Sequence, residues 1–189
     1  MNHTKKLVIM ALLIAMSIVL TRLLMIEPTP AIRISFGFAP IVLMAMLFKP
    51  AYAGIGAAVA DVVGFFIFRP AGTFFPGFTL TAFLMGVTYW AFLRNYPVKM
   101  WRVCAAALIV TIGLNLILDT IWLTIILREG VVALIPQRVI RTAVMLPIQV
   151  VTIRFLVSER FRAILPMHKK QHKHESFTFV PPSLDMELE

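Results

Sequence analysis

The sequence predicts an all-α membrane protein, a bundle of six transmembrane helices with both termini in the cytoplasm. Three observations predict this class. Sixty per cent of the 189 residues are hydrophobic and the mean hydropathy is +0.89, whereas soluble chains are about 45–50% apolar. The apolar residues gather in six runs. Most basic residues lie between those runs, a pattern typical of membrane topology and not of a nucleic-acid-binding face.

The first three runs cover residues 7–26, 36–48 and 51–68. The first is long enough to cross a bilayer and too long for the core of a cleaved signal peptide, so we expect a retained helix. It ends at Glu27-Pro28-Thr29-Pro30, because proline disfavours helix at its own position and at the preceding residue. The second run is short, so we expect it to be tilted or to cross incompletely.

The last three runs cover residues 78–93, 103–127 and 135–157. Pro147 lies inside the sixth, where neighbouring helices can satisfy the carbonyl that it leaves free. Residues 1–158 are therefore predicted to form one transmembrane substrate-binding domain. Residues 159–189 are polar, with histidines, prolines and acidic residues, and are predicted to form a cytoplasmic tail.

The basic residues predict the orientation. When loops are assigned alternately to the two sides, one side receives twelve lysines and arginines and the other receives six. The positive-inside rule places the richer side in the cytoplasm. All lysines fall on that side, whereas the outer side carries only arginines, namely Arg22, Arg33, Arg69, Arg128, Arg138 and Arg141. Arginine binds carboxylates bidentately, so this asymmetry favours an anionic ligand; the alternative is that these arginines snorkel at helix ends.

Two carboxylates lie within predicted spans. Asp61 is in the third, near Phe65, and Asp119 is in the fifth, with Asn115 and Trp122 at i−4 and i+3. Such residues usually face a bundle interior or a water-filled cavity. Their amide, carboxylate and indole groups suit a flat heterocycle. The alternative is that the aspartates pair with arginines to hold helices together.

The sixth span places Arg138, Arg141, Met145 and Gln149 on one helical face. The loop of residues 69–77 contains Arg69, Phe74 and Phe75 and is either a lid over a flat ligand or part of an interfacial aromatic belt.

Small residues recur at four-residue spacing on two spans. Gly56, Ala60 and Gly64 form such a row on the third, and Ala11 and Ala15 form a shorter one on the first. Either row allows a second helix to approach closely, most simply within the bundle itself.

No catalytic residue, cofactor site or metal site is predicted. The chain has no phosphate-binding loop of the form G-x-x-x-x-G-K-[ST], no HExxH and no CxxC, and its single cysteine is Cys104. Acid–base catalysis by Asp61 and Asp119 is a weak alternative, because no nucleophile or metal ligand set accompanies them. The protein is therefore not expected to be an enzyme, and ATP-driven transport would require a partner.

Several segments resemble the substrate-specific (S) components of energy-coupling factor (ECF) vitamin transporters. Residues 60–64 and 69–80 resemble the third helix and following loop of that family. Residues 119–123, Arg138–Arg141 and Pro147-Ile148-Gln149 are similar to the folate-specific type, and residues 11–15 are similar to the AxxxA motif that docks on the transmembrane T component. The resemblance covers about residues 5–158.

The resemblance implies a six-helix subunit of the prokaryotic plasma membrane that binds folate from the outside and delivers it with a T component and two ATPases. It implies partner docking through Ala11 and Ala15. Another vitamin such as pantothenate, or an autonomous secondary carrier, remains an alternative. The expected substrate-binding residues are Arg22, Arg33, Asp61, Phe65, Arg69, Phe74, Phe75, Asn115, Asp119, Trp122, Arg138 and Arg141.

Overall fold

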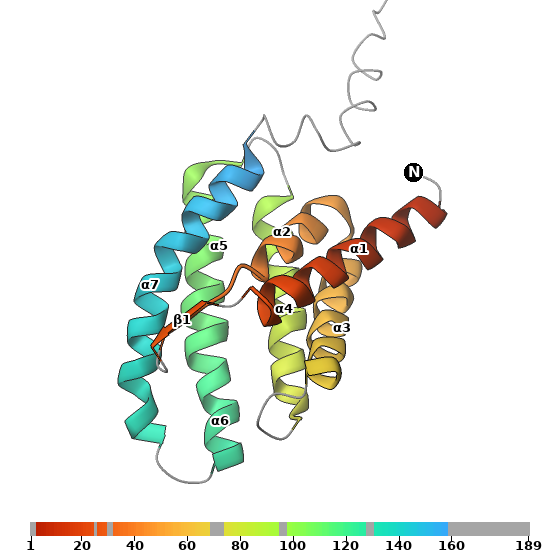
Figure 1. Cartoon of the computed structure of the whole chain (residues 1–189). Helices are drawn as coiled ribbons and strands as arrows, with labels where there is room; N and C mark the ends of the chain where they lie inside the picture. Colours follow the sequence, from red (N-terminus) through yellow and green to blue (C-terminus); the bar gives the residue numbers. More distant parts are fainter. Residues whose placement is uncertain are drawn as a thin grey trace, which may run out of the picture.

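Six helical segments follow one another in the computed structural model (Figure 1), which describes residues 3–24, 26–29, 32–68, 74–94, 98–127 and 131–158. The elements in chain order are α1 (His3–Arg22), β1 (Ile26–Thr29), β2 (Ile32–Ile34), α2 (Phe38–Leu47), α3 (Pro50–Phe68), α4 (Pro76–Leu93), α5 (Met100–Leu108), η1 (Ile109–Leu118), α6 (Asp119–Leu127) and α7 (Val131–Val157). The predicted helical bundle is confirmed. The predicted tail, residues 159–189, lies outside the described residues.

Five of the segments are long and apolar enough to cross a membrane, with α5, η1 and α6 forming one continuous helix over residues 100–126. The exception is α2. Its ten residues extend about 15 Å, half the hydrocarbon thickness of a bilayer. Seven of those ten residues are buried, and α2 contacts α1, α3, α4 and α7. The second predicted span is therefore a short helix enclosed by its neighbours.

The first helix ends four residues earlier than predicted. The helix ends at Arg22. Further along the chain, β1 pairs with β2 as an antiparallel ribbon, in which the backbone of Ile26 is opposite Ile34 and that of Thr29 is opposite Ile32. Pro28 favours the extended backbone of β1, but it lies beyond the residue at which the helix ends. The ribbon was not predicted from the sequence; it contacts α7 through β2 and crosses in front of the bundle in Figure 1.

Glycines allow α3 and α4 to pack closely. A Cβ on Gly86 would lie 2.6 Å from the Ala53 carbonyl oxygen, and one on Gly54 would lie 2.7 Å from the Phe83 ring. The predicted row of small residues on α3 faces other neighbours: Gly56 faces Met44 of α2, and Gly64 faces α1. That row serves internal packing. By contrast, Ala11 and Ala15 on α1 are exposed.

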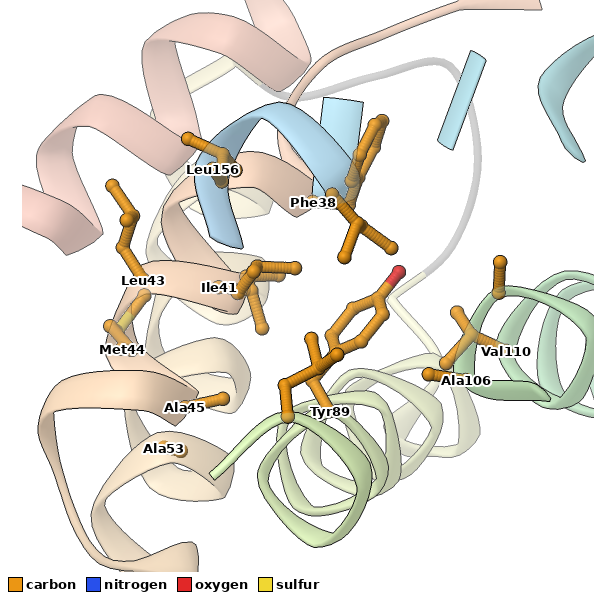
Figure 2. Close-up of a cluster of buried hydrophobic side chains, with 14 of the residues drawn as sticks. Phe38, Ile41, Leu43, Met44, Ala45, Ala53, Tyr89, Ala106, Val110 and Leu156 are labelled. Carbon is orange, nitrogen blue, oxygen red and sulfur yellow. The ribbon is translucent and has the colours of Figure 1, made fainter. Parts of the chain in front are cut away.

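The apolar core lies between α2, α4, α5, η1 and the end of α7 (Figure 2). The Tyr89 ring of α4 is completely buried there, between Ile41 on one side and Ala106 and Val110 on the other. Its hydroxyl has no hydrogen-bond partner among the described residues. Close packing around this ring fixes the helices that surround the site.

Candidate ligand-binding cavity

A cavity of about 610 Å³ opens within the half of the bundle where α1, α3 and α6 end and α2, α4 and α7 begin. This volume is in the usual range for small-molecule sites, about 300–1,000 Å³. Each helical element named above, apart from α5, contributes residues to the lining. The cavity is therefore assembled by the tertiary fold, and no single helix could form it.

Both predicted carboxylates line this one cavity. The Thr79 hydroxyl of α4 donates a hydrogen bond of 3.0 Å to Oδ2 of Asp61 on α3. Oδ1 of Asp119 is buried, and within the described part of the chain it has no hydrogen-bond partner. Leaving an acceptor oxygen buried and unpaired costs about 1–3 kcal/mol, which a donor that reached it would recover.

The predicted arginines are divided between the cavity and its surroundings. Arg22 at the end of α1 and Arg141 of α7 line the cavity. Arg138 does not, and its Nη1 instead donates to the Asn115 carbonyl oxygen at 3.4 Å and to the Thr120 hydroxyl at 3.0 Å. The structure does not describe the Arg33 side chain or any part of Arg69. Two guanidinium groups therefore accompany two carboxylates in one cavity.

Phenylalanine rings form the apolar part of the lining. Phe65, Phe74, Phe75 and Phe78 all face the cavity. The centroids of Phe65 and Phe74 are 5.3 Å apart, and those of Phe75 and Phe78 are 6.2 Å apart. These separations are typical of edge-to-face aromatic contacts. The described end of the predicted lid, Phe74 and Phe75, therefore borders the cavity.

Trp122 supports the lining from behind. Its ring centroid lies 5.6 Å from that of Phe75, and its indole Nε1 donates to the Thr81 hydroxyl at 3.2 Å. A Cβ on Gly77 would lie 2.6 Å from the Trp122 ring, so glycine is required for this close approach. Trp122 is not among the residues that line the cavity.

Trp122 and Leu123 both lie on α6, and only Leu123 lines the cavity. Asp119, Leu123 and Ile126 line it together, at the i, i+4 and i+7 spacing of one α-helical face. The i+3 spacing from Asp119 had selected Trp122, whereas the residue at i+4 is the one in the lining. The π-helical segment η1 ends at Leu118 and contributes Asn115.

Polar residues that the sequence analysis did not include in the site also line the cavity: Ser17, Thr21, Ser35, Thr81 and Gln149. The Ser17 hydroxyl donates to the Gly37 carbonyl at 3.0 Å and joins α1 to the start of α2. The Thr111 hydroxyl donates to Oε1 of Gln149 and joins η1 to α7. The four-residue spacing of Ser17 and Thr21 within an apolar span was a usable signal for this polar face.

Comparison with known proteins identifies the family. Residues 5–166 match the family described as "ECF transporter, substrate-specific component". The chain is 43% identical over 153 residues to the folate transporter FolT of Clostridium novyi, a match covering 81% of this chain and 88% of the relative. It is 34% identical over 163 residues to the FolT of Leuconostoc mesenteroides, covering 83% and 86%.

A solved structure gives the same result in three dimensions. The crystal structure of FolT bound with folic acid has a TM-score of 0.74 and 41% sequence identity to this chain, and the match covers 81% of this chain and 92% of that one. The family match, the relatives and the shared fold agree with the apolar helices that surround a polar cavity. The chain therefore belongs to the substrate-specific components of ECF transporters.

Proposed function

We propose that this chain is the folate-binding subunit of an ECF importer in a prokaryotic plasma membrane. The observation that carries the proposal is one cavity lined by two carboxylates, two guanidinium groups and five phenylalanine rings. Folate is a flat pterin joined through an aminobenzoyl ring to a glutamate. The pterin requires hydrogen-bond acceptors, the aminobenzoyl ring requires an aromatic surface, and the glutamate requires cations. The relatives named as folate transporters support the same substrate.

The pterin ring is proposed to occupy the part of the cavity bordered by the carboxylates. The 2-amino group and N3–H of a pterin are adjacent donors, and a carboxylate accepts two such donors with matched geometry. Asp119 supports this role through its unpaired oxygen, and Asp61 and Asn115 face the same space. The rings of Phe65, Phe74 and Phe75 provide surfaces for stacking, with Trp122 fixing Phe75 from behind.

The glutamate tail is proposed to bind the arginines. Arg22 and Arg141 line the cavity, and a guanidinium group can hold a carboxylate through two parallel hydrogen bonds. Arg33, whose backbone lies in β2, and Arg69 remain in the proposal on the basis of the sequence. Arg138 is assigned a supporting role, because it donates to Asn115 and Thr120.

The cavity is proposed to open to the outside of the cell. The helices alternate in direction along the chain, so the ends that carry Lys5, Lys49, Lys99 and Arg154 share one side and the cavity end faces the other. The positive-inside rule makes the first side cytoplasmic. Both termini would then be cytoplasmic.

Energy is proposed to come from a T component and two ATPase subunits, since this sequence has no phosphate-binding loop. Ala11 and Ala15 are exposed on α1, and exposed small residues at this spacing allow a partner helix to approach its backbone closely. These two alanines are the proposed docking site.

Isothermal titration calorimetry of the purified chain tests the proposal. Folic acid should bind with one site, and pantothenate should not compete at a hundredfold excess. Binding of pantothenate without folic acid would assign the site to a different vitamin. Reconstitution in liposomes should give folate uptake only when the T component and the ATPases are present, and uptake by this chain alone would indicate an autonomous carrier.

A further inference from the structure

The π-helical segment η1 rotates the inward face of α6 relative to that of α5. In α5 and the start of η1, four residues at α-helical spacing are buried in the core: Val103, Ala106, Ala107 and Val110. A helix with about 3.6 residues per turn throughout would repeat its orientation after about five turns, or about 18 residues. Ile121 would then face inward as Val103 does, and Ile125 would repeat Ala107. Instead, Ile121 is 47% exposed and Ile125 is 54% exposed.

A different face of α6 points inward. Asp119, Leu123 and Ile126 line the cavity. A π-helix has more residues per turn than an α-helix, so each of its residues turns the chain through a smaller angle. The ten residues of η1 therefore change which face of α6 meets the bundle. In a regular α-helix with Ile121 inward, Asp119 would lie on the opposite face and meet lipid, where a carboxylate is costly.

The junction between η1 and α6 leaves a backbone carbonyl to be satisfied. The Asp119 amide donates to the Leu114 carbonyl, five residues back. In an α-helix such as α6, each amide donates to the carbonyl four residues back. Where the partner changes from five to four residues back, one carbonyl is passed over and needs another donor. The carbonyl next in line after Leu114 is that of Asn115.

Two polar side chains occupy this junction. Nη1 of Arg138 on α7 donates to the Asn115 carbonyl at 3.4 Å and to the Thr120 hydroxyl at 3.0 Å. The Thr120 hydroxyl in turn donates to the Leu116 carbonyl. Neither Arg138 nor Thr120 lines the cavity. Both side chains therefore contact the helix at the point where its winding changes, and not the space for the ligand.

We propose that Arg138 and Thr120 are positioning residues that hold the π-helical winding of η1, and that this winding turns the Asp119 face of α6 into the cavity. The guanidinium group takes the place of the missing amide donor at Asn115. Without it, the segment returns toward α-helical winding, and Ile121 turns inward. The effect on ligand binding rests on the proposed function, because folic acid is the ligand expected to meet this face.

Nitroxide labels report the rotation directly. Ile121→Cys, Ile125→Cys and Val151→Cys are labelled one at a time in a Cys104→Ala background, and power-saturation EPR in liposomes measures the oxygen accessibility of each label. All three positions should be accessible from lipid, because all three side chains are exposed. Adding Thr120→Val should lower the accessibility at positions 121 and 125 and leave position 151 unchanged. Low accessibility at 121 and 125 before that change would overturn the inference without any unstable variant.

Calorimetry connects the rotation to binding. Thr120→Val and Arg138→Met should each weaken folic acid binding about tenfold, the loss expected for one hydrogen bond. Arg138 also lies near enough to Asp119 to interact with it through charge. Thr120→Val leaves that charge in place, so its loss of affinity would come from the winding. Thr120→Ser keeps the hydroxyl and should restore most of the affinity. Thr124→Val, which removes an exposed hydroxyl of α6, is the matched control.

The two measurements distinguish this inference from the proposed function. Wild-type folic acid affinity in both Thr120→Val and Arg138→Met would overturn the inference. So would a weakened Thr120→Val in which positions 121 and 125 keep their oxygen accessibility. Failure of the unaltered chain to bind folic acid would overturn the proposed function, whereas the EPR comparison would still decide whether these two residues hold the winding.

Discussion

The hydroxyl of Thr79 donates a 3.0 Å hydrogen bond to the carboxylate of Asp61 and so joins the first turn of α4 to the middle of α3. The two residues lie 18 positions apart in the sequence. Asp61 faces the cavity, and Arg22 lies near enough to interact with it through charge. The hydroxyl holds the carboxylate in one orientation before a ligand arrives, which lowers the entropic cost of binding.

Thr79→Val should therefore weaken folic acid binding about three- to tenfold, since a hydrogen bond to a charged group contributes about 1.5–3 kcal/mol and water replaces part of it. Calorimetry measures the change. Thr124→Val is the matched control, because its hydroxyl bonds only the Thr120 carbonyl on an exposed part of α6. Equal losses in the two variants would show that the effect is a general response of these helices to removal of a threonine.

Asp119→Leu should weaken folic acid binding at least tenfold, because it removes the acceptor oxygens proposed for the pterin. The carboxylate has a buried oxygen without a partner among the described residues, so Asp119→Asn, which keeps the shape of the side chain, is compared with Asp119→Leu. Arg138 and Arg141 lie near enough to interact with Asp119 through charge, so both variants should melt below the wild-type temperature, because they leave these guanidinium groups with one fewer counter-charge. Calorimetry and a thermal melt in detergent measure the two quantities. A lower melting temperature together with full binding would assign Asp119 to structure and remove it from the site.

Arg141→Ala should weaken folic acid binding at least tenfold but leave 6-hydroxymethylpterin binding unchanged, because the pterin lacks the glutamate that Arg141 is proposed to hold. Arg138→Met should instead weaken both ligands and lower the melting temperature, since Arg138 bonds Asn115 and Thr120 outside the cavity. Arg94→Ala is the control, because Arg94 lies over the Trp90 ring at the opposite end of α4. Equal losses for both ligands in Arg141→Ala would contradict the glutamate assignment.

The sequence was sufficient to predict the helices, because backbone in a bilayer must form its own hydrogen bonds and apolar runs of span length follow from that need. It also predicted that Asp61 and Asp119 share an interior space with arginines, since charged residues within spans avoid lipid. Both aspartates, Arg22 and Arg141 now line one cavity.

Other features depend on tertiary packing that no local pattern records. Residues at i+3 and i+4 from Asp119 share a helical face, so the spacing alone could not decide that Leu123 and not Trp122 lines the cavity. The bond between Thr111 and Gln149 joins residues 38 positions apart, so it requires the register between η1 and α7. The prolines after α1 predicted only a helix end, whereas the pairing of β1 with β2 depends on both extended segments together.

Gly77→Ala should weaken folic acid binding and lower the melting temperature. A Cβ at this position would lie 2.6 Å from the Trp122 ring, so Trp122 or Phe75 must move, and Phe75 lines the cavity. Gly113→Ala is the control, because its Cβ would have its nearest contact at 4.0 Å, and it should bind folic acid normally. Calorimetry and thermal melts compare the pair. Wild-type affinity in Gly77→Ala would show that the Phe75 position does not matter for binding.

Ala11→Trp combined with Ala15→Trp should abolish folate uptake and leave folic acid affinity unchanged. Both alanines are exposed, and neither lines the cavity, so two indole rings would prevent close approach of a partner helix without reaching the site. Uptake is measured in liposomes that contain the T component and the ATPases. Val151→Trp on the exposed face of α7 controls for a bulky side chain elsewhere on the surface and should transport normally. Normal uptake by the double variant would place the partner on another face. Loss of uptake in Val151→Trp as well would mean that a large side chain on any exposed face of the bundle prevents transport, so that the alanines would not mark a particular docking site.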